Sequence, residues 1–398
     1  MCGICGFYQV KKGGRSEPSQ IIAKMNNMQK RRGPDSEGIF SQNIESGGIL
    51  GLGHSRLSIL DLSSAGHQPL KYQKSNIKNQ RCRELWITFN GEIYNFIELK
   101  KDLENRGCKF KTKTDTEVIL ALYNEYGEKS FSMLRGMFAF GLWDGQNNSL
   151  FLVRDRYGIK PLYYYYDSEK LIFASTVKAL EKSGLVPVKK NRKAYKSFLL
   201  FGSVPFPMTT IEKVFSLQAG HYLVKNGNNH KIIKYYDILD PFLNKSSDNF
   251  NEAVLKVKNL LEEAVRLHMV SDAPLGIFLS GGLDSSAIAS ISSRTRKAPI
   301  TTLSVNFEEK NFSEKPFQDL IVGEIKSDHR EIKITKEFFE NSFDEIFEAM
   351  DQPTIDGVNT FFIAKAAKRA GLKTVLSGLG SDEIFMGYPF FKRMSGLK

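Results

Sequence analysis

Residues 275–291 read LGIFLSGGLDSSAIASI, and this stretch predicts a strand, a glycine-rich turn and a helix in direct succession. The apolar run 275–279 has the length of a buried parallel strand, and 287–291 has the composition of a helix. A turn of this kind presents backbone N–H groups to an anion at the positive end of the helix dipole. The stretch therefore indicates a site for a phosphorylated ligand.

The polar residues of this turn have distinct chemical uses. Gly281 and Gly282 allow a positive φ angle and a close approach of the backbone to a ligand. Ser280 and Ser285 add hydroxyl donors, and Asp284 can bind a divalent cation. The turn lacks the lysine of a G-x-x-x-x-G-K-[ST] loop and the spacing of a dinucleotide-binding turn, so neither common motif explains it. An ordinary strand-to-helix turn is the alternative.

The chain around this turn alternates strands with helices. We expect helices at 254–268, 316–326, 336–350 and 359–370, and strands at 300–307, 329–334 and 373–377. This alternation predicts an α/β domain with a parallel sheet, whose ligands bind at the carboxyl ends of the strands. The loop 378–383, GLGSDE, then lies on the same edge as the turn, where Asp382 joins Asp284 as an oxygen ligand for Mg²⁺. A helix-capping role for Asp382 is the alternative.

The chain starts MCGICGF, with Cys2 directly after the initiator. Removal of Met1 leaves Cys2 with a free α-amino group, whose reference pKa of about 7.7–8.0 lets it act as base toward its own thiol. A redox pair or half a zinc site formed with Cys5 is the rival interpretation, but Cys82 and Cys108 are far apart and supply no second half. We therefore predict an N-terminal nucleophile, with Cys5 as a small buried side chain.

Candidate partners for this nucleophile begin with a predicted strand at 85–89, LWITF. At its end, the Asn90 amide and the Gly91 N–H can form an oxyanion hole. A type I′ hairpin turn is the usual interpretation of Asn-Gly. The segment 94–99 that follows has helical spacing, which weakens that alternative.

Two charged residues complete the set. The stretch 54–60, HSRLSIL, predicts an alternating strand that carries one cation, Arg56. Asp115 begins or caps a helix predicted over 118–126.

Together these residues resemble the class II glutamine amidotransferases over roughly the first half of the chain. The resemblance implies an α+β N-terminal-nucleophile hydrolase sandwich, with antiparallel sheets between helices. It implies that Cys2 attacks the glutamine amide and releases ammonia, with the oxyanion held by Asn90 and Gly91. Arg56 would pair with the glutamine α-carboxylate, and Asp115 with the Glu92 region would meet its α-amino group. The implied glutamine site comprises Arg56, Leu57, Ser58, Ile59, Leu60, Asn90, Gly91, Glu92 and Asp115.

The stretches SGGLDS at 280–285 and SGLGSDE at 377–383 are arranged as in the glutamine-hydrolysing asparagine synthetases, whose second domain is of the ATP pyrophosphatase type. The stretch 154–164, RDRYGIKPLYY, also resembles this family; we read it as a charged turn before a hairpin, with a structural role. The resemblance implies that ATP adenylates the side-chain carboxylate of aspartate, which ammonia then attacks. The implied ATP site comprises Leu279, Ser280, Gly281, Gly282, Asp284, Ser285, Val305, Ser377 and Gly378, and the implied Mg²⁺ ligands are Asp284 and Asp382.

Two departures from that family keep alternatives open. Leu379 stands between the glycines of the second loop, where family members commonly have glutamate. The family also usually continues well beyond Lys398, so we expect a synthetase domain that is incomplete at its C-terminus. The alternatives are an amidotransferase acting on another carboxylate in sugar or peptide biosynthesis, a glutaminase with an inactive synthetase half, and a non-catalytic nucleotide-binding protein.

Composition and length set the remaining expectations. The 398 residues are 41% hydrophobic and 25% charged, as in a soluble globular protein, and carry a net charge of +12. The lysines are scattered and no nucleic-acid module is found, so we expect no nucleic-acid partner. The absence of a signal peptide or membrane span, and only four cysteines, predict a cytoplasmic location. We expect a glutaminase domain at 2–190, a connector with edge strands at 191–247 and a synthetase domain at 248–398, and a homodimer is left open.

Overall fold

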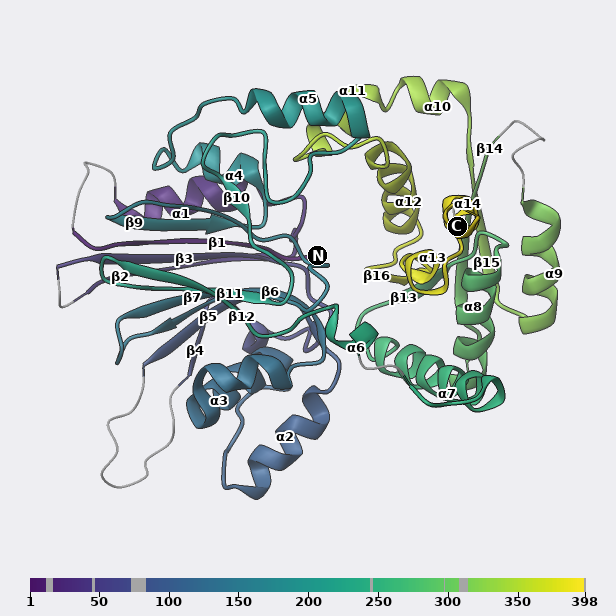
Figure 1. The fold of residues 1–398 in the computed structure, drawn as a ribbon, viewed down its shortest axis with the longest axis horizontal. Helices are drawn as coiled ribbons and strands as arrows, with labels where there is room; N and C mark the ends of the chain where they lie inside the picture. Colours follow the sequence, from purple (N-terminus) through teal and green to yellow (C-terminus); the bar gives the residue numbers. More distant parts are fainter. Residues whose placement is uncertain are drawn as a thin grey trace. The chain divides into compact units, whose positions relative to one another are not determined.

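The computed structural model describes residues 1–11, 17–44, 47–72, 84–243, 246–296, 298–307 and 314–396 (Figure 1). The chain forms two compact units. The first comprises residues 1–246 together with 350–355, and the second comprises 247–349 and 356–398. The first unit therefore includes a short piece of chain from far along the sequence.

Within the described residues, the first unit contains two antiparallel sheets of six strands each. The first sheet runs in the order β10 (Phe215–Ser216), β8 (Tyr163–Tyr166), β9 (Lys170–Ala174), β1 (Gly3–Gln9), β3 (Ile49–Arg56) and β2 (Ser36–Asn43). The second sheet runs in the order β12 (Asn229–Lys234), β11 (His221–Asn226), β7 (Ser149–Arg154), β6 (Gly136–Asp144), β5 (Leu85–Ile93) and β4 (Leu70–Tyr72).

The two sheets pack face to face, with helices on the outer face of each (Figure 1). Ile4 and Leu52 of the first sheet meet Trp143 and Leu152 of the second in a common core. Helices α1 (Pro18–Asn27) and α4 (Val177–Lys182) cover the first sheet, whereas α2 (Phe96–Asn105) and α3 (Asp115–Tyr126) cover the second. This arrangement confirms the predicted sandwich of antiparallel sheets between helices. The other helices described in this unit are η1 (Ser64–Gly66), η2 (Gly127–Met133), α5 (Arg192–Phe201) and α6 (Asp240–Leu243).

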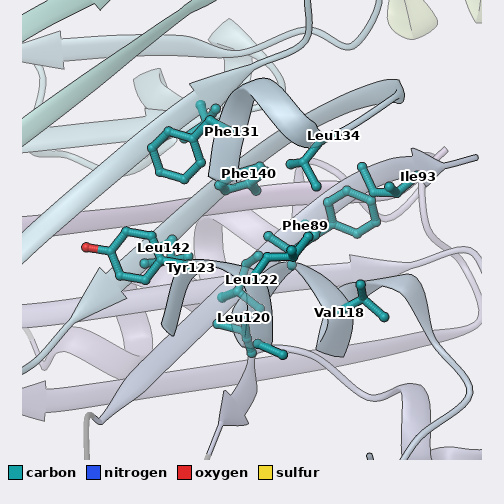
Figure 2. Close-up of a cluster of buried hydrophobic side chains, with 14 of the residues drawn as sticks. Phe89, Ile93, Val118, Leu120, Leu122, Tyr123, Phe131, Leu134, Phe140 and Leu142 are labelled. Carbon is teal, nitrogen blue, oxygen red and sulfur yellow. The ribbon is translucent and has the colours of Figure 1, made fainter. Parts of the chain in front are cut away.

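Helix α3 shows how local sequence and packing agree. The Thr114 side chain caps the helix by accepting the N–H of Glu117, and Gly127, at φ 58°, ends it. Between these ends the residues 115–123 are all buried. Figure 2 shows side chains of α3 packed with aromatic and aliphatic residues of β5, β6 and η2, such as Phe131. The predicted helix is thus confirmed. Its first turn is held in place because its side chains are buried against the hydrophobic core of this unit.

The strands that carry candidate site residues differ from the predicted ones in their limits. Strand β3 begins at Ile49 and ends at Arg56, instead of spanning 54–60. All its residues are buried because both faces of the sheet are covered, so it lacks the expected alternation. Strand β5 continues to Ile93, which places Asn90 and Gly91 inside a paired strand rather than at a strand end. The predicted hairpin after the 154–164 stretch is confirmed as β8 and β9.

Among the described residues, the second unit contains a parallel sheet of four strands, as predicted. Its order is β15 (Asp328–Ile334), β14 (Thr301–Phe307), β13 (Leu275–Phe278) and β16 (Thr374–Leu376). Its helices are α7 (Phe250–His268), α8 (Leu283–Thr295), α9 (Lys315–Ile325), α10 (Lys336–Glu340), α11 (Phe343–Ala349), α12 (Gly357–Arg369), α13 (Ser381–Phe385) and α14 (Pro389–Ser395). No helix in the described ranges combines the length and apolar character needed to cross a membrane.

Two predicted helices of this unit need correction. The helix expected over 336–350 is divided into α10 and α11, and between them the Ser342 hydroxyl donates to the carbonyl of Phe338, a bond of the kind that weakens a helix. The sequence predicts an apolar face along the whole of 254–268, but only the C-terminal part of α7 packs into the hydrophobic core. Val265 lies in the core, whereas Val254 is 51% exposed.

Candidate active site

A pocket in the first unit brings most of the predicted glutamine-site residues together. It is lined by Met1, Cys2, Arg56, Leu57, Ile59, Leu60, Gly66, Gln68, Phe89, Asn90, Gly91, Glu92, Thr114, Asp115, Thr116 and Lys160. Of the residues expected to bind glutamine, Ser58 does not line the pocket; its N–H donates to the Asp35 carboxylate at 2.8 Å. The pocket therefore lies where β3, β5 and the start of α3 meet.

Hydrogen bonds between the two sheets fix the strands that supply this pocket. Nε2 of His54 lies 3.1 Å from the Phe89 carbonyl, and the Thr88 hydroxyl donates to the Gly53 carbonyl at 2.8 Å. Burial lowers the pKa of His54 to about 3, so the imidazole is neutral and can donate only one N–H. The side-chain oxygen of Gln68 accepts the Phe89 N–H at 2.7 Å. Asn90, next in the strand, is thus held at a fixed distance from β3.

Cys2 lies beside the backbone of Leu57. Its Sγ is 3.4 Å from the Leu57 nitrogen and 3.6 Å from the Leu57 carbonyl oxygen. Burial raises the pKa of the thiol, while the nearby terminal amine opposes this shift. Burial also lowers the pKa of that amine, here on Met1, to about 5, so it is unprotonated at neutral pH. Arg32 anchors the main chain of Cys2, because its Nε donates to the Cys2 carbonyl at 3.0 Å.

Asn90 presents a donor that has no partner among the described residues. Its side chain is 1% exposed, and Nδ2 forms no hydrogen bond there. Buried amide donors are nearly always satisfied, so an unpaired one in a pocket points to a ligand atom. At Gly91, an added Cβ would lie 2.2 Å from the Met137 carbonyl oxygen, so only glycine fits the paired strand. This donor fits the binding of a developing oxyanion.

Opposite charges line this pocket. The Arg56 guanidinium donates to the carbonyls of Ser63 at 2.8 Å and Asp61 at 2.6 Å. Within the described part of the chain it forms no salt bridge with a carboxylate. Asp115 is 4% exposed and accepts the Ile93 N–H at 2.9 Å, and burial raises its pKa to about 6. A cation and a carboxylate in one pocket suit an α-amino acid, which carries both charges.

The second unit builds the predicted turn at the carboxyl end of β13. The hydroxyls of Ser280 and Ser285 lie 2.9 Å apart, and the Ser285 hydroxyl donates to the Gly282 carbonyl at 3.1 Å. Gly281 has a φ of 87°, a conformation that favours glycine. The turn leads into the 13 residues of α8, so its backbone lies at a helix N-terminus as expected.

The second predicted loop lies next to this turn. A Cβ added at Gly378 would come within 3.0 Å of the Cβ of Asp284. The hydroxyl of Ser377 accepts the Leu379 N–H at 3.2 Å, and the Leu379 side chain is 89% exposed. The structure therefore brings the two loops of this unit together.

The other predicted ATP-site residues lie in the supporting core. The Leu279 side chain is 1% exposed and packs with Ile277 and Ala289, while its carbonyl accepts the Ser304 hydroxyl at 2.6 Å. Val305 is partly buried in a neighbouring cluster. These two residues shape the sheet edge on which the loops stand.

Comparison with known proteins identifies two family domains in the chain. The chain matches the family model of the glutamine amidotransferase domain over residues 1–236 and that of asparagine synthase over 256–398. It is 37% identical over 404 residues to the Methanocaldococcus jannaschii protein named putative glutamine-hydrolysing asparagine synthetase 2, with 98% of this chain and 76% of that protein covered. The chain belongs to the glutamine-hydrolysing asparagine synthetase family. Members of this family are ATP-dependent ligases.

Other relatives include a synthetase and an amidase. The glutamine-hydrolysing asparagine synthetase 1 of Bacillus subtilis is 34% identical, with all of this chain and 60% of that protein covered. The amidase chry2 of Gibberella zeae is 32% identical, with 98% of this chain and 60% of that protein covered. The chain thus spans about three fifths of the length of these two relatives.

Asp284 and Asp382, the residues predicted to bind Mg²⁺, carry carboxylates whose chemistry fits that ion. The carboxylates of Asp284 and Asp382 accept no hydrogen bond from the side chains and backbone that the structure describes, although the main-chain carbonyl of Asp382 accepts the Gly387 N–H. The same part of the chain contains no cluster of three or more potential metal ligands. Mg²⁺ in nucleotide sites commonly takes one or two carboxylates and completes its coordination with phosphate oxygens and water. Asp284 at the start of α8 and Asp382 at the start of α13 supply carboxylates of the kind that pattern requires.

Sequence reasoning missed Lys160, which belongs to the family-like stretch 154–164. The Asp155 carboxylate accepts the N–H groups of Tyr157, Ile159 and Lys160 at 3.0 Å each. Nε of Arg154 donates to the Lys160 carbonyl at 2.8 Å. These hydrogen bonds fix the loop, and Lys160 lines the pocket. Burial there lowers the pKa of its ammonium group. Arg154 and Asp155, at the start of this stretch, were the residues in the sequence that could have pointed to Lys160.

Proposed function

We propose that this chain hydrolyses glutamine at Cys2 and uses the released ammonia to convert aspartate and ATP into asparagine, AMP and pyrophosphate. The observation that supports the glutaminase reaction is the unpaired Asn90 amide in the pocket that also contains Cys2, Arg56 and Asp115. The turn at Ser280 and its neighbouring loop support the ATP-dependent synthetase reaction. In this proposal residues 2–190 are the glutaminase domain, 191–247 the connector and 248–398 the synthetase domain.

In the glutaminase reaction, Arg56 binds the α-carboxylate of glutamine and Asp115 its α-ammonium group. With Met1 removed, the α-amine of Cys2 takes the thiol proton while Sγ attacks the amide carbon. The oxyanion is bound by the Asn90 amide and the Gly91 N–H. The C–N bond then breaks, the amine returns the proton to the leaving nitrogen, and water hydrolyses the thioester to glutamate.

In the synthetase reaction, Ser280, Ser285 and the backbone of the turn bind the ATP phosphates. Asp284 and Asp382 would hold Mg²⁺, which neutralises phosphate charge when it is bound. The aspartate carboxylate attacks the α-phosphorus and displaces pyrophosphate. Ammonia then attacks the activated carbonyl and displaces AMP. A cytoplasmic homodimer completes the proposal.

A second acceptor is favoured by Leu379. Glutamate can exchange a proton or bind a cation, and leucine can do neither. An exposed leucine beside the nucleotide turn suits a less polar acceptor, and one relative is named an amidase rather than a synthetase. The same ATP chemistry would then amidate another carboxylate.

The test uses the purified chain with glutamine, ATP, Mg²⁺ and aspartate, and measures glutamate, pyrophosphate, AMP and asparagine. All four products should appear together. Glutamate without AMP would leave only the glutaminase. AMP formation with a different carboxylate, and none with aspartate, would support the second acceptor. No glutamate at all would contradict the proposed nucleophile.

A further inference from the structure

Two side chains take the place of a strand along one edge of β5. Among the described strands, β4 pairs with residues 85–87 on that side and then ends. Beyond it, Oε1 of Gln68 accepts the Phe89 N–H at 2.7 Å. Further along β5, Oδ2 of Asp115 accepts the Ile93 N–H at 2.9 Å. Gln68 and Asp115 therefore bracket the part of β5 that contains the proposed oxyanion hole.

Gly91 lies between these two anchors. N–H groups of alternate residues in an antiparallel strand point to the same side, so the Gly91 N–H faces the same edge as those of Phe89 and Ile93. The residue opposite Gly91 in β6 is Phe138, whose N–H and carbonyl bond to Asp155 instead, at 3.2 and 2.8 Å. The Gly91 N–H is thus directed to the pocket that Gly91 lines, and the two anchors determine its position.

The two anchors are joined to each other through Thr116. Because the Phe89 N–H is a donor, the side-chain oxygen of Gln68 faces it, which turns Nε2 toward Thr116. Nε2 donates to the Thr116 hydroxyl at 3.2 Å, and this hydroxyl donates its single proton to Oδ1 of Asp115 at 3.4 Å. All three side chains are buried, which strengthens these bonds. Both oxygens of the Asp115 carboxylate are therefore tied to β5, one directly and one through Thr116 and Gln68.

We propose that Gln68 is a positioning residue for the glutaminase reaction: together with Thr116 it fixes the distance between the oxyanion hole and the carboxylate of Asp115. This inference rests on the proposed glutaminase. In that reaction the two sites bind opposite ends of one glutamine, the side-chain amide oxygen and the α-ammonium group. The bridge therefore keeps the amide in place for attack while the α-ammonium group is bound.

The experiment measures glutamate formation by the full chain, and its inhibition by glutaramate, which is glutamine without the α-amino group. Thr116→Val removes only the middle of the bridge, so the glutamine KM should rise about three- to tenfold with kcat within about twofold of the wild type. The inhibition constant of glutaramate should stay within about twofold, because glutaramate has no ammonium group for Asp115 to bind. Thr116→Ser retains the hydroxyl and should keep the wild-type KM.

Thr209→Val is a matched control. Thr209 is a buried threonine of the same unit that does not line the pocket, and its hydroxyl accepts the Ile211 N–H at 3.2 Å and donates to the Val214 carbonyl at 2.9 Å. Its replacement removes a hydroxyl with the same number of partners in the same fold. Thr209→Val should change neither the glutamine KM nor the glutaramate constant.

Gln68→Met keeps the length of the side chain and removes both of its bonds. It should lower kcat about tenfold, because the edge of β5 that carries the oxyanion hole loses an anchor, and it should raise the glutamine KM as Thr116→Val does. In the double variant with Thr116→Val, the KM should equal that of Gln68→Met alone, since the two residues act in series. If Gln68→Met does not fold, the Thr116 variants carry the test.

Three results would overturn the inference. Thr116→Val could weaken glutamine and glutaramate equally, which would reveal a purely structural role. The effects on KM could multiply in the double variant, or all values could equal those of the Thr209→Val control. A wild-type chain that hydrolyses no glutamine would instead overturn the proposed function, and calorimetric titration of glutamine and glutaramate into the same variants would then test the bridge.

Discussion

Replacement of Asp115 by asparagine should make the first unit more stable and, at the same time, weaken its binding of glutamine. The Asp115 carboxylate is buried, and burial raises its pKa from 3.8 to about 6. At neutral pH the folded protein therefore holds a charge that would be better solvated in the unfolded chain. Asparagine removes that charge and retains an oxygen that can accept the Ile93 N–H.

The size and sign of the effect follow from the two pKa values. A carboxyl group whose pKa is raised by folding contributes stability below its unfolded pKa and loses it as the pH rises through the folded value. The 2.2-unit difference corresponds to about 3 kcal/mol at pH 8, and to about 0.5 kcal/mol at pH 4. Asp115→Asn should thus gain up to about 3 kcal/mol over the wild type at pH 8 and almost nothing at pH 4.

Glutamine binding should change in the opposite direction. Loss of a charged hydrogen-bond partner costs about 1.5–3 kcal/mol, which raises KM about 10- to 150-fold. Denaturant unfolding at pH 4 and pH 8 gives the stability difference, and initial rates of glutamate formation give KM. For the wild type, KM should also rise as the pH falls through about 6, because protonation of Asp115 removes the same charge. A variant that is less stable at pH 8, or that binds glutamine normally, would refute this account.

Three further changes test the remaining parts of the site. Cys2→Ala should abolish glutamate formation and leave synthesis with added ammonia intact, since the nucleophile and the nucleotide turn lie in different units; equal loss of both activities in a folded protein would contradict this. Asp284→Ala should lower pyrophosphate release at least tenfold with unchanged glutaminase kinetics, because charge stabilisation through the metal is worth several kcal/mol; normal release would make Asp284 a turn residue only. Leu379→Glu should raise the yield of asparagine from aspartate, ATP and ammonia; an already high wild-type yield would show that Leu379 does not select another acceptor.

Sequence reasoning was most successful where chemistry depends on short, local motifs. The turn at Ser280 needs only its own glycines and hydroxyls, and it was predicted together with its strand and helix. Asp115 was also placed correctly at the start of a helix. In both cases the residues that define the geometry are neighbours in the chain.

The errors arise where tertiary structure determines the local environment. Strand β3 lacks alternation because sheets and helices cover both of its faces, which no local pattern reveals. Lys160 reaches the pocket because Asp155 and Arg154 hydrogen-bond to its loop, whereas the sequence suggested only a structural role for this charged turn. The Asp351 carboxylate accepts the Val177 N–H at the start of α4, and nothing in either stretch points to the other.

The contribution of 350–355 to the first unit has a consequence for synthesis on the ribosome. The roughly hundred residues between Ser246 and Asp351 take about 5–20 s to translate. During that time the N–H groups of Val177 and Lys178 lack the Asp351 carboxylate that they bind in the finished protein. The hydrogen bonding at the start of α4 is therefore completed only after about a hundred residues of the second unit have been made.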